Sequence, residues 1–338
     1  MRVLAIPKFS NRKVTPYNSL LYSEIEAQGT TVGEGWHGFV QRPWRWDVIH
    51  MHWPEAYCRG RFSAIRQIVL LAGVVANRFA GGRLVQTVHN VRPHEPVGRV
   101  DQRFLNALDR LTRGVLAHSD STLEEIARLR PNLCRALTTV TSHGPFDSAH
   151  GRVESSQRHD VPPDPKLLFV GYIRPYKGVS DLVRVFQQTK LNGGLMIAGQ
   201  PSSVEVEDEL RQLAADDPRV ELRLGYLSDA ELGPLIVDAD IVVLPYLEVT
   251  MSGTLLLALS FETPVIVPSA GALLDVKNSV GPGWIATYDP PLTADSLADC
   301  VRSVCATTRP TSPTLPRWAQ IASDTIKFYS SVRSADRT

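Results

Sequence analysis

The stretch that decides the fold is an apolar run followed by a basic loop, Leu167-Leu168-Phe169-Val170-Gly171-Tyr172-Ile173-Arg174-Pro175-Tyr176-Lys177-Gly178. The run has the length and composition of a buried strand, and a helical pattern begins at Val179. Arg174 and Lys177 place positive charge between strand and helix, and an Arg can grip a phosphate through two donors. The stretch therefore predicts a strand, an anion-binding loop and a helix. A solvated connection is the alternative interpretation.

A second segment, Ser252-Gly253-Thr254, opens the helical stretch Leu255–Phe261. A helix N-terminus presents unpaired N–H groups and a partial positive charge, so it suits an anion. Ser252 could also be only a helix cap. Taken together, the two segments predict a bound nucleotide diphosphate. Neither a Walker loop, which would need Ser or Thr where Val179 stands, nor a GxGxxG fingerprint is present.

Strand and helix patterns alternate through both halves of the chain. In the first half the predicted strands are Val3–Ile6, Val48–His52, Leu84–Val88, Val115–Ala117 and Thr138–Val140. In the second half they are Leu167–Val170, Leu195–Ala198, Val220–Leu224, Ile241–Leu244 and Val265–Val267. Helical patterns lie between them, two of them with capping signatures at Ser121/Glu124 and Ser228/Glu231. Such alternation predicts an α/β protein with parallel sheets covered on both faces.

The organisation predicts two Rossmann-like, doubly wound domains that face a cleft. We place the first at residues 1–150, a Pro- and Ser-containing linker at 151–165, and the second at 166–315. A C-terminal helix at 316–338 has no strand of its own and is expected to pack back across the domain junction. In such sheets ligands bind at the carboxyl ends of the strands.

Composition excludes several classes of protein. The chain has 338 residues, of which 43% are hydrophobic and 21% charged, with a net charge of +1. A nucleic-acid partner is not expected at this charge, and no apolar run is long enough for a transmembrane helix. The four cysteines show no metal-binding spacing and suggest free thiols, which favours the cytoplasm. Lys and Arg exceed Asp and Glu in the first 150 residues, and the reverse holds afterwards.

Two strands of the first half end in clusters of polar and aromatic residues. His50, His52, Trp53 and Glu55 lie at the end of one, and the other is followed by His89, Asn90, His94 and Glu95. These ends predict a site, unless they are satisfied polar residues of the core. A metal site built from His50, His52, His89, His94 and Glu55 is disfavoured, because the segments contain no His-x-x-x-His helix and no Cys cluster.

These motifs resemble those of the GT-B glycosyltransferases, and more narrowly the bacterial β-mannosyltransferases of xanthan-type exopolysaccharide assembly. The matching segments span nearly the whole chain: His50–Glu55, Thr87–Asn90, Pro93–Glu95, Ile173–Gly178, Val243–Tyr246, Ser252–Ser260 and Val280–Trp284. The resemblance implies GDP-mannose as donor substrate, no further cofactor, and a glycan or polyprenyl-diphosphate-linked acceptor bound by the first domain.

Site roles follow from this resemblance. Arg174, Lys177, Ser252, Gly253 and Thr254 would bind the donor diphosphate. Glu55, Glu95 and His89 form the predicted catalytic set, with Glu55 favoured as general base and His89 contacting the donor sugar. The remaining predicted contacts to donor or acceptor sugar are His52, Trp53, Asn90, Tyr246 and Glu248.

One departure from the broader group concerns stereochemistry. Its retaining members carry two Glu residues separated by seven residues, and here those positions are Val249 and Leu257, with Glu248 one residue off. The sequence therefore favours inversion without a metal ion. The alternatives are a retaining transferase using another nucleotide sugar, a nucleotide-sugar 2-epimerase, or a sugar-binding protein without catalysis.

A basic, apolar segment suggests where a lipid-linked acceptor could be met. Arg59, Arg61 and Arg66 precede the apolar stretch Ile68–Val75, and Arg78 and Arg83 follow it. A basic amphipathic helix can lie on an anionic membrane surface. An ordinary helix facing the core is the alternative. The expected location is thus cytoplasmic, with peripheral attachment to the inner face of the membrane, while the donor base, the acceptor and the oligomeric state stay open.

Overall fold

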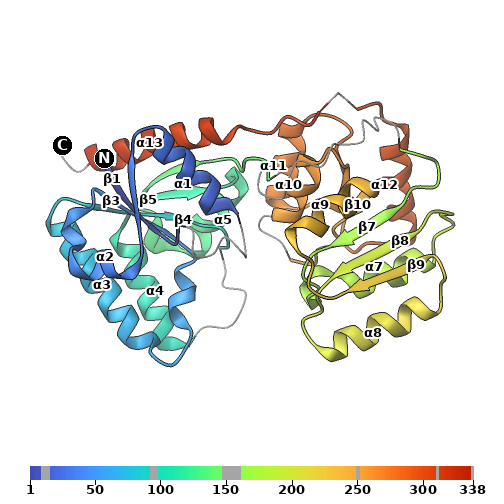
Figure 1. Cartoon of the computed structure of the whole chain (residues 1–338), viewed down its shortest axis with the longest axis horizontal. Helices are drawn as coiled ribbons and strands as arrows, with labels where there is room; N and C mark the ends of the chain where they lie inside the picture. Colours follow the sequence, from blue (N-terminus) through green and yellow to red (C-terminus); the bar gives the residue numbers. More distant parts are fainter. Residues whose placement is uncertain (9–15, 92–97, 147–160, 249–251, 310–311, 336–338) are drawn as a thin grey trace. The chain divides into compact units, whose positions relative to one another are not determined.

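A computed structural model describes residues 1–8, 16–91, 98–146, 161–248, 252–309 and 312–335. The chain forms two compact units, Met1–Gly144 with Pro316–Thr338, and Pro145–Leu315 (Figure 1). Most of the predicted linker, up to residue 160, lies outside the described residues. Within the described residues no helix has the length and apolarity to cross a membrane.

Unit 1 is built on a six-stranded parallel sheet in the order β2-β1-β3-β4-β5-β6. Its strands are β1 (Arg2–Ile6), β2 (Thr31–Glu34), β3 (Val48–His52), β4 (Arg83–Thr87), β5 (Thr112–Ala117) and β6 (Leu137–Val140). Its helices are α1 (Tyr17–Ala27), α2 (Trp36–Gln41), α3 (Ser63–Phe79), α4 (Arg99–Leu111), α5 (Asp120–Leu129) and α13 (Trp318–Ser334). Short 3₁₀ turns lie at η1 (Pro43–Arg45), η2 (Pro54–Cys58) and η3 (Pro131–Leu133).

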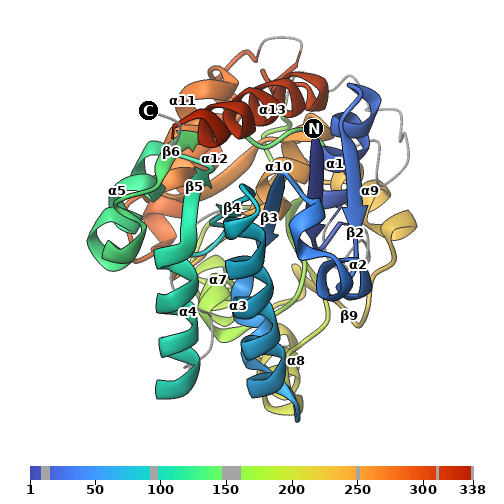
Figure 2. The ribbon, with the colours of Figure 1, turned by 90° about the vertical axis from the view of Figure 1, so that its left-hand side faces the viewer.

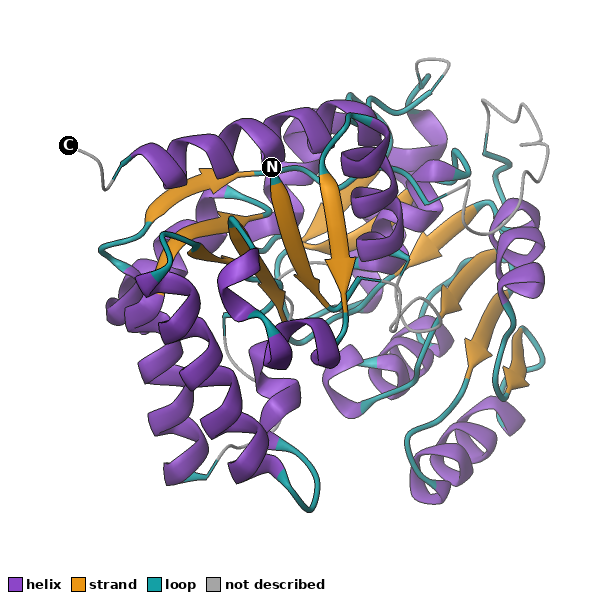
Figure 3. Cartoon of the chain, turned by 60° about the vertical axis from the view of Figure 1, so that its left-hand side comes forward, coloured by secondary structure: helices purple, strands orange, loops and turns teal. Residues whose placement is uncertain are grey.

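Helices cover both faces of the unit 1 sheet. On one side α3 and α4 lie side by side and bury Leu70, Val74, Phe104 and Leu108 against β1, β3 and β4 (Figure 2). On the other side α13 lies along α1 and contacts β4 and β5 (Figure 3). The buried residues of α13 recur at the spacing of one helical face, and they are Trp318, Ile321, Ala322, Thr325, Phe328, Tyr329 and Val332. The last helix of the chain therefore completes the first unit.

Unit 2 carries a second six-stranded parallel sheet, in the order β12-β11-β10-β7-β8-β9. Its strands are β7 (Leu167–Val170), β8 (Leu195–Gly199), β9 (Val220–Leu224), β10 (Ile241–Val243), β11 (Val265–Pro268) and β12 (Ile285–Tyr288). Its helices are α7 (Val179–Gln187), α8 (Val204–Ala215), α9 (Asp229–Asp238), α10 (Gly253–Ser260), α11 (Gly271–Val280) and α12 (Ala294–Ala306), with a 3₁₀ turn η4 at Pro175–Lys177. The strands β7 and β10 are buried throughout, as expected of a parallel sheet with helices on both faces.

The strand orders place a topological switch point in each sheet. In unit 2 the chain winds outward from β7 in one direction and from β10 in the other, which is the order of the dinucleotide-binding folds. In unit 1 the corresponding point lies between β1 and β3, as in the flavodoxin-like order. The predicted α/β fold with two doubly wound sheets is confirmed. Ligands are expected in the crevice outside the strand ends at these two points.

Candidate active site

The loop after β7 is held close to the loop after β10, at the switch point of unit 2. Gly178 has φ +64, and a Cβ at this position would lie 2.3 Å from the carbonyl oxygen of Pro245. Only glycine combines that backbone conformation with so close an approach. The backbone N–H of Leu247 also donates to the carbonyl of Tyr176 at 2.9 Å. The two loops thus form one surface at the sheet edge.

Gly171 leaves a gap between a cation and a helix start. A Cβ on Gly171 would lie 3.5 Å from Nζ of Lys177 and 3.5 Å from Oγ1 of Thr254. Thr254 belongs to the first turn of α10, whose N-cap is Ser252. Because Gly171 has no side chain, the Lys177 ammonium and the start of α10 border the same space. The structure therefore brings together the two segments that the sequence singled out.

Ser252 and Tyr246 fix the start of α10. The Ser252 hydroxyl oxygen accepts from the backbone N–H of Leu255 at 3.2 Å and lies 2.9 Å from the Tyr246 hydroxyl. Tyr246 is buried, and burial raises its pKa to about 12, so its ring stays neutral. Nζ of Lys177 lies 5.8 Å from the centre of that ring, within cation–π range. Tyr246 thus positions the helix start and the ammonium, rather than offering an exposed hydroxyl to a sugar.

The cations of this loop differ in their surroundings. Burial, and then the neighbouring Arg174, lower the pKa of Lys177 to about 8. The Arg174 guanidinium is exposed and lies 5.9 Å from the ring centre of Tyr172, and Arg174 lines a pocket together with residues of α7 and α8. A desolvated ammonium at a helix N-terminus is an electrostatically strained arrangement that an anion would relieve. Glu248 is exposed, and residues 249–251 after it lie outside the described residues.

At the switch point of unit 1, the chain turns sharply after β3. Trp53 has φ 48 and ψ 59, a left-handed conformation that is uncommon for a large side chain. Pro54 then begins η2, and Glu55 follows in its first turn. Glu55 is half-buried, and burial raises its pKa. This turn holds a carboxylate with raised basicity on a rigid segment at the sheet edge.

Trp53 and Asn90 flank His89 at the end of β4. The Trp53 ring stacks on the His89 ring, with centres 4.1 Å apart and planes inclined by 14°. Asn90 is half-buried next to it. Glu95 and His94 lie outside the described residues. The structure therefore brings Trp53 and His89 together, while the predicted role of Glu95 stays a prediction.

A chain of hydrogen bonds runs through the buried histidines of unit 1. His50 Nδ1 lies 2.8 Å from the Tyr22 hydroxyl and 2.6 Å from that of Tyr329. The Tyr22 hydroxyl continues to His52 Nε2 at 2.7 Å. His52 Nδ1 then contacts His89 Nε2 at 2.9 Å.

The far end of this chain fixes its direction. His89 Nδ1 lies 3.2 Å from His118 Nε2, and His118 Nδ1 lies 3.0 Å from the carbonyl oxygen of Thr141. A carbonyl only accepts, so neutral His118 carries its proton on Nδ1 and accepts through Nε2. It follows that His89 donates from Nδ1 and accepts from His52, which in turn accepts from Tyr22. One backbone carbonyl thereby sets the tautomers of three imidazoles.

Burial keeps these imidazoles neutral. Desolvation lowers the pKa of His50 to about 3 and that of His118 to about 4. Desolvation and the neighbouring histidines lower the pKa values of His52 and His89 well below the usual range. His89 already uses both ring nitrogens in the chain, so contact with a sugar would exchange one of these bonds. His52 is 1% exposed, which argues against the sugar contact predicted for it.

Sequence reasoning missed several residues of this cluster. Tyr22, His118 and Tyr329 belong to the hydrogen-bond chain, and Tyr17, His143 and Trp318 pack against its rings. The ring of Tyr17 packs against His89, His118, His143 and Trp318. The usable signal was that His118 and His143 each follow a strand closely, as His89 does.

The fold is that of the GT-B glycosyltransferases, and comparison with known proteins agrees. Residues 164–306 match the family described as glycosyl transferases group 1. The chain is 32% identical over 285 residues to GDP-mannose:glycolipid 4-beta-D-mannosyltransferase of Xanthomonas campestris pv. campestris, covering 82% of this chain and 77% of that protein. The chain therefore belongs to the group 1 glycosyltransferases and is an enzyme of this class.

More distant relatives share the fold. The chain is 25% identical over 266 residues to 2-deoxystreptamine glucosyltransferase of Streptomyces kanamyceticus, covering 73% of this chain and 66% of that protein. Among solved structures, sucrose-phosphate synthase of Thermosynechococcus elongatus matches with a TM-score of 0.72 at 15% identity, covering 99% of this chain and 100% of that one. Anabaena HepE in complex with UDP matches with a TM-score of 0.63 at 16% identity, covering 99% and 95%.

Proposed function

We propose that this enzyme transfers a mannosyl group from GDP-mannose to a glycolipid acceptor, with inversion at the anomeric carbon. The observation that carries the proposal is the cationic gap at Gly171, bordered by Lys177 and the start of α10. Its chemistry suits the diphosphate of a nucleotide sugar. The mannosyl donor and the glycolipid acceptor come from the name of the Xanthomonas relative.

On the donor side, the diphosphate binds across the loop after β7 and the N-terminus of α10. Lys177 supplies a full charge, and Arg174 adds a second cation from the exposed part of the loop. Gly253 and Thr254 offer backbone N–H groups that the helix itself does not use. Charge that develops on the leaving diphosphate is stabilised by these groups, so the proposal requires no divalent metal in this step.

On the acceptor side, Glu55 is the proposed general base. It accepts the proton of the acceptor hydroxyl while that oxygen attacks the anomeric carbon, and the bond from this carbon to the diphosphate oxygen breaks. GDP leaves with the electron pair of that bond, and the product carries the inverted configuration. The raised pKa of Glu55 favours it as a base, since a stronger base takes the proton more readily.

The proposed membrane contact is the outer face of α3. This face exposes Phe62, Ile65, Ile68, Val75 and Phe79, which are 65, 61, 67, 37 and 89% exposed. The buried side of the same helix carries Leu70 and Val74 together with two polar residues, Gln67 and Asn77. Arg59, Arg61 and Arg78 are exposed at the ends of the segment. An apolar stripe with basic ends fits an anionic bilayer surface, where the acceptor lipid would be met at the inner face.

A transfer assay tests the proposed reaction. Purified enzyme is incubated with GDP-, UDP-, dTDP- or ADP-sugars and a polyprenyl-diphosphate-linked oligosaccharide, and the product linkage is read by NMR. We expect transfer from GDP-mannose with a β-linkage, unchanged when Mg²⁺ or Mn²⁺ is added. An α-linked product would identify a retaining transferase instead. Conversion of the nucleotide sugar without any acceptor would identify an epimerase.

A further inference from the structure

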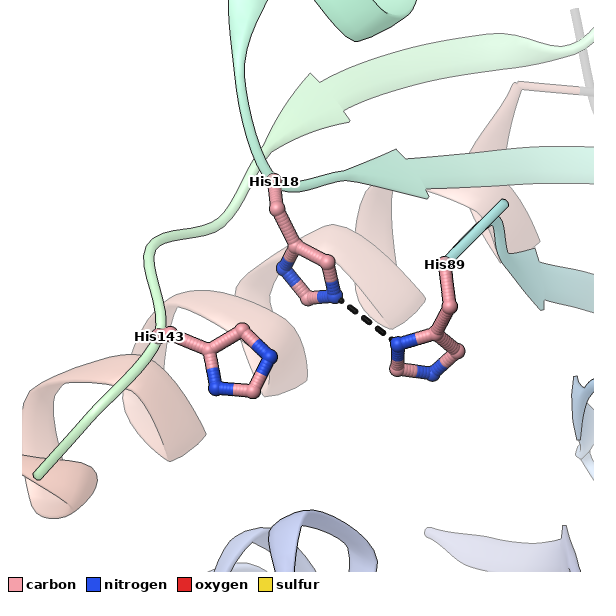
Figure 4. A group of neighbouring side chains, drawn as sticks. All are labelled: His89, His118 and His143. Atoms are coloured by element: carbon pink, nitrogen blue, oxygen red, sulfur yellow. Dashed lines mark hydrogen bonds between the residues drawn. The ribbon is translucent and has the colours of Figure 1, made fainter. Parts of the chain in front are cut away.

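Three histidines follow three neighbouring strands of the unit 1 sheet. His89 comes two residues after β4, His118 directly after β5, and His143 three residues after β6. These strands are adjacent and parallel, so their carboxyl ends share one edge. One ring nitrogen of each histidine lies within 4.8 Å of one ring nitrogen of both others, and the three rings converge on one space (Figure 4). We propose that this triad binds a single Zn²⁺ ion.

The donor set fits zinc chemistry. Imidazole nitrogens suit Zn²⁺, and three protein ligands with a fourth position left to water form a common site. Zinc–nitrogen bonds of about 2.0 Å at a tetrahedral angle place the ligand nitrogens about 3.3 Å apart. His89 Nδ1 and His118 Nε2 are already 3.2 Å apart, so the remaining adjustment falls mainly on His143, whose ligand nitrogen lies within 4.8 Å of the other two. His118 and His143 are 6 and 9% exposed, and the rings of Tyr17 and Trp318 pack around His143. The site is therefore largely shielded from water.

Neighbouring groups already orient two of the ligands. Histidines that bind metals almost always donate their second ring N–H to a fixed acceptor. His118 does so from Nδ1 to the carbonyl of Thr141, which turns the lone pair of Nε2 toward the triad. His89 is held on its other side by His52, because Nε2 of His89 lies 2.9 Å from Nδ1 of His52.

Binding of the ion would reverse part of the hydrogen-bond chain. Without metal, His89 donates from Nδ1 to His118. With metal, His89 Nδ1 supplies a lone pair, so its proton moves to Nε2 and is donated to His52. His52 then donates from Nε2 to Tyr22, which donates to His50. Each imidazole keeps one proton, so the reversal changes no net charge on the histidines.

Metal titration of the whole chain tests the triad independently of any transferase activity. Untagged protein is stripped with a chelator and titrated with Co²⁺ and then Zn²⁺. We expect about one ion per chain, a visible Co²⁺ absorption of tetrahedral type, and its loss on addition of Zn²⁺. In ¹⁵N-histidine NMR, the proton of His89 is expected to move from Nδ1 to Nε2.

Three variants separate ligands from their supports. His118→Gln and His143→Gln should abolish the Co²⁺ absorption, while His52→Gln should keep it with affinity about 10- to 100-fold lower. Circular dichroism checks that each variant is folded. Stripped wild-type protein that takes up neither metal overturns the proposal, even where a variant fails to fold. Undiminished binding by both His118→Gln and His143→Gln overturns it as well.

Discussion

Lys177 shows how one residue couples burial to ligand binding. Its pKa of about 8 means that the free protein begins to lose this charge just above neutral pH. An anion binds the ammonium form, so affinity for GDP should fall as the pH rises through about 8, at most tenfold per pH unit. The measurement is calorimetric titration of GDP between about pH 7 and 9. Lys177→Arg, which stays charged throughout, should flatten this dependence. Equal pH profiles for the two proteins would refute the assignment.

The same position sets the strength of donor binding. Lys177→Ala removes a charge-assisted contact of about 2 kcal/mol, so GDP affinity should drop about thirtyfold. Arg174→Ala should also weaken binding, by less because its guanidinium is exposed. Unchanged affinity and turnover in both variants would place the diphosphate elsewhere.

Glu55 carries the prediction for the proton transfer. Glu55→Gln keeps the shape of the turn but removes the base, so donor binding should persist while turnover falls about a hundredfold or more. Because burial raises the pKa of Glu55, turnover of the wild type should fall as decreasing pH protonates this carboxylate. Single-turnover kinetics with Glu95→Gln as the comparison decides the matter. A larger loss in Glu95→Gln would move the role to Glu95, and full activity in both would place the base elsewhere.

At the scale of elements, α3 gives a prediction for membrane attachment. Replacing Ile65, Ile68 and Phe79 with Ser should weaken binding to phosphatidylglycerol vesicles by about a thousandfold or more, since each apolar side chain contributes about 1.5–3 kcal/mol when fully inserted. Val204→Ser is the matched control, because Val204 in unit 2 is 67% exposed, as Ile68 is. Binding is measured by vesicle sedimentation. If the triple variant sediments like the wild type, α3 is not the docking face.

Regular elements were largely predictable, and the exceptions have physical causes. β3 and β7 have the predicted bounds, because a short apolar run defines each of them. The missed strands β2 and β12 lie at sheet edges, and β2 buries only Val32. The Ser228/Glu231 capping box is confirmed, whereas α5 is capped by Ser119 and not by Ser121. Both serines suit a cap, so the sequence alone could not choose between them.

The phosphate loop of unit 2 and the histidine triad of unit 1 differed in how far the sequence could predict them. The phosphate loop is local, since strand, cation and helix start follow one another. The histidine triad depends on strand order, which brings together residues separated by long stretches of chain. His118 and His143 therefore had no local motif, and only the sheet topology joins them to His89.

For the whole molecule, the two units should respond separately to a change in the core. Phe328 packs on the sheet of unit 1, so Phe328→Ala should destabilise that unit by about 3–5 kcal/mol. Lys327→Ala, on the exposed side of α13, should change stability by less than about 1 kcal/mol. Calorimetry is expected to show one lowered transition and GDP affinity unchanged, because the proposed donor residues lie in unit 2. A parallel loss of GDP binding would contradict this independence.

Because α13 is the last helix and yet belongs to unit 1, the order of synthesis differs from the order of folding. The ribosome must make all of residues 145–315, which takes on the order of ten seconds or more, before α13 can cover β4 and β5. Unit 2 is continuous in sequence and can finish first. During this interval the nascent first unit lacks the helix that covers β4 and β5, so this face of its sheet stays open to solvent until α13 has been made.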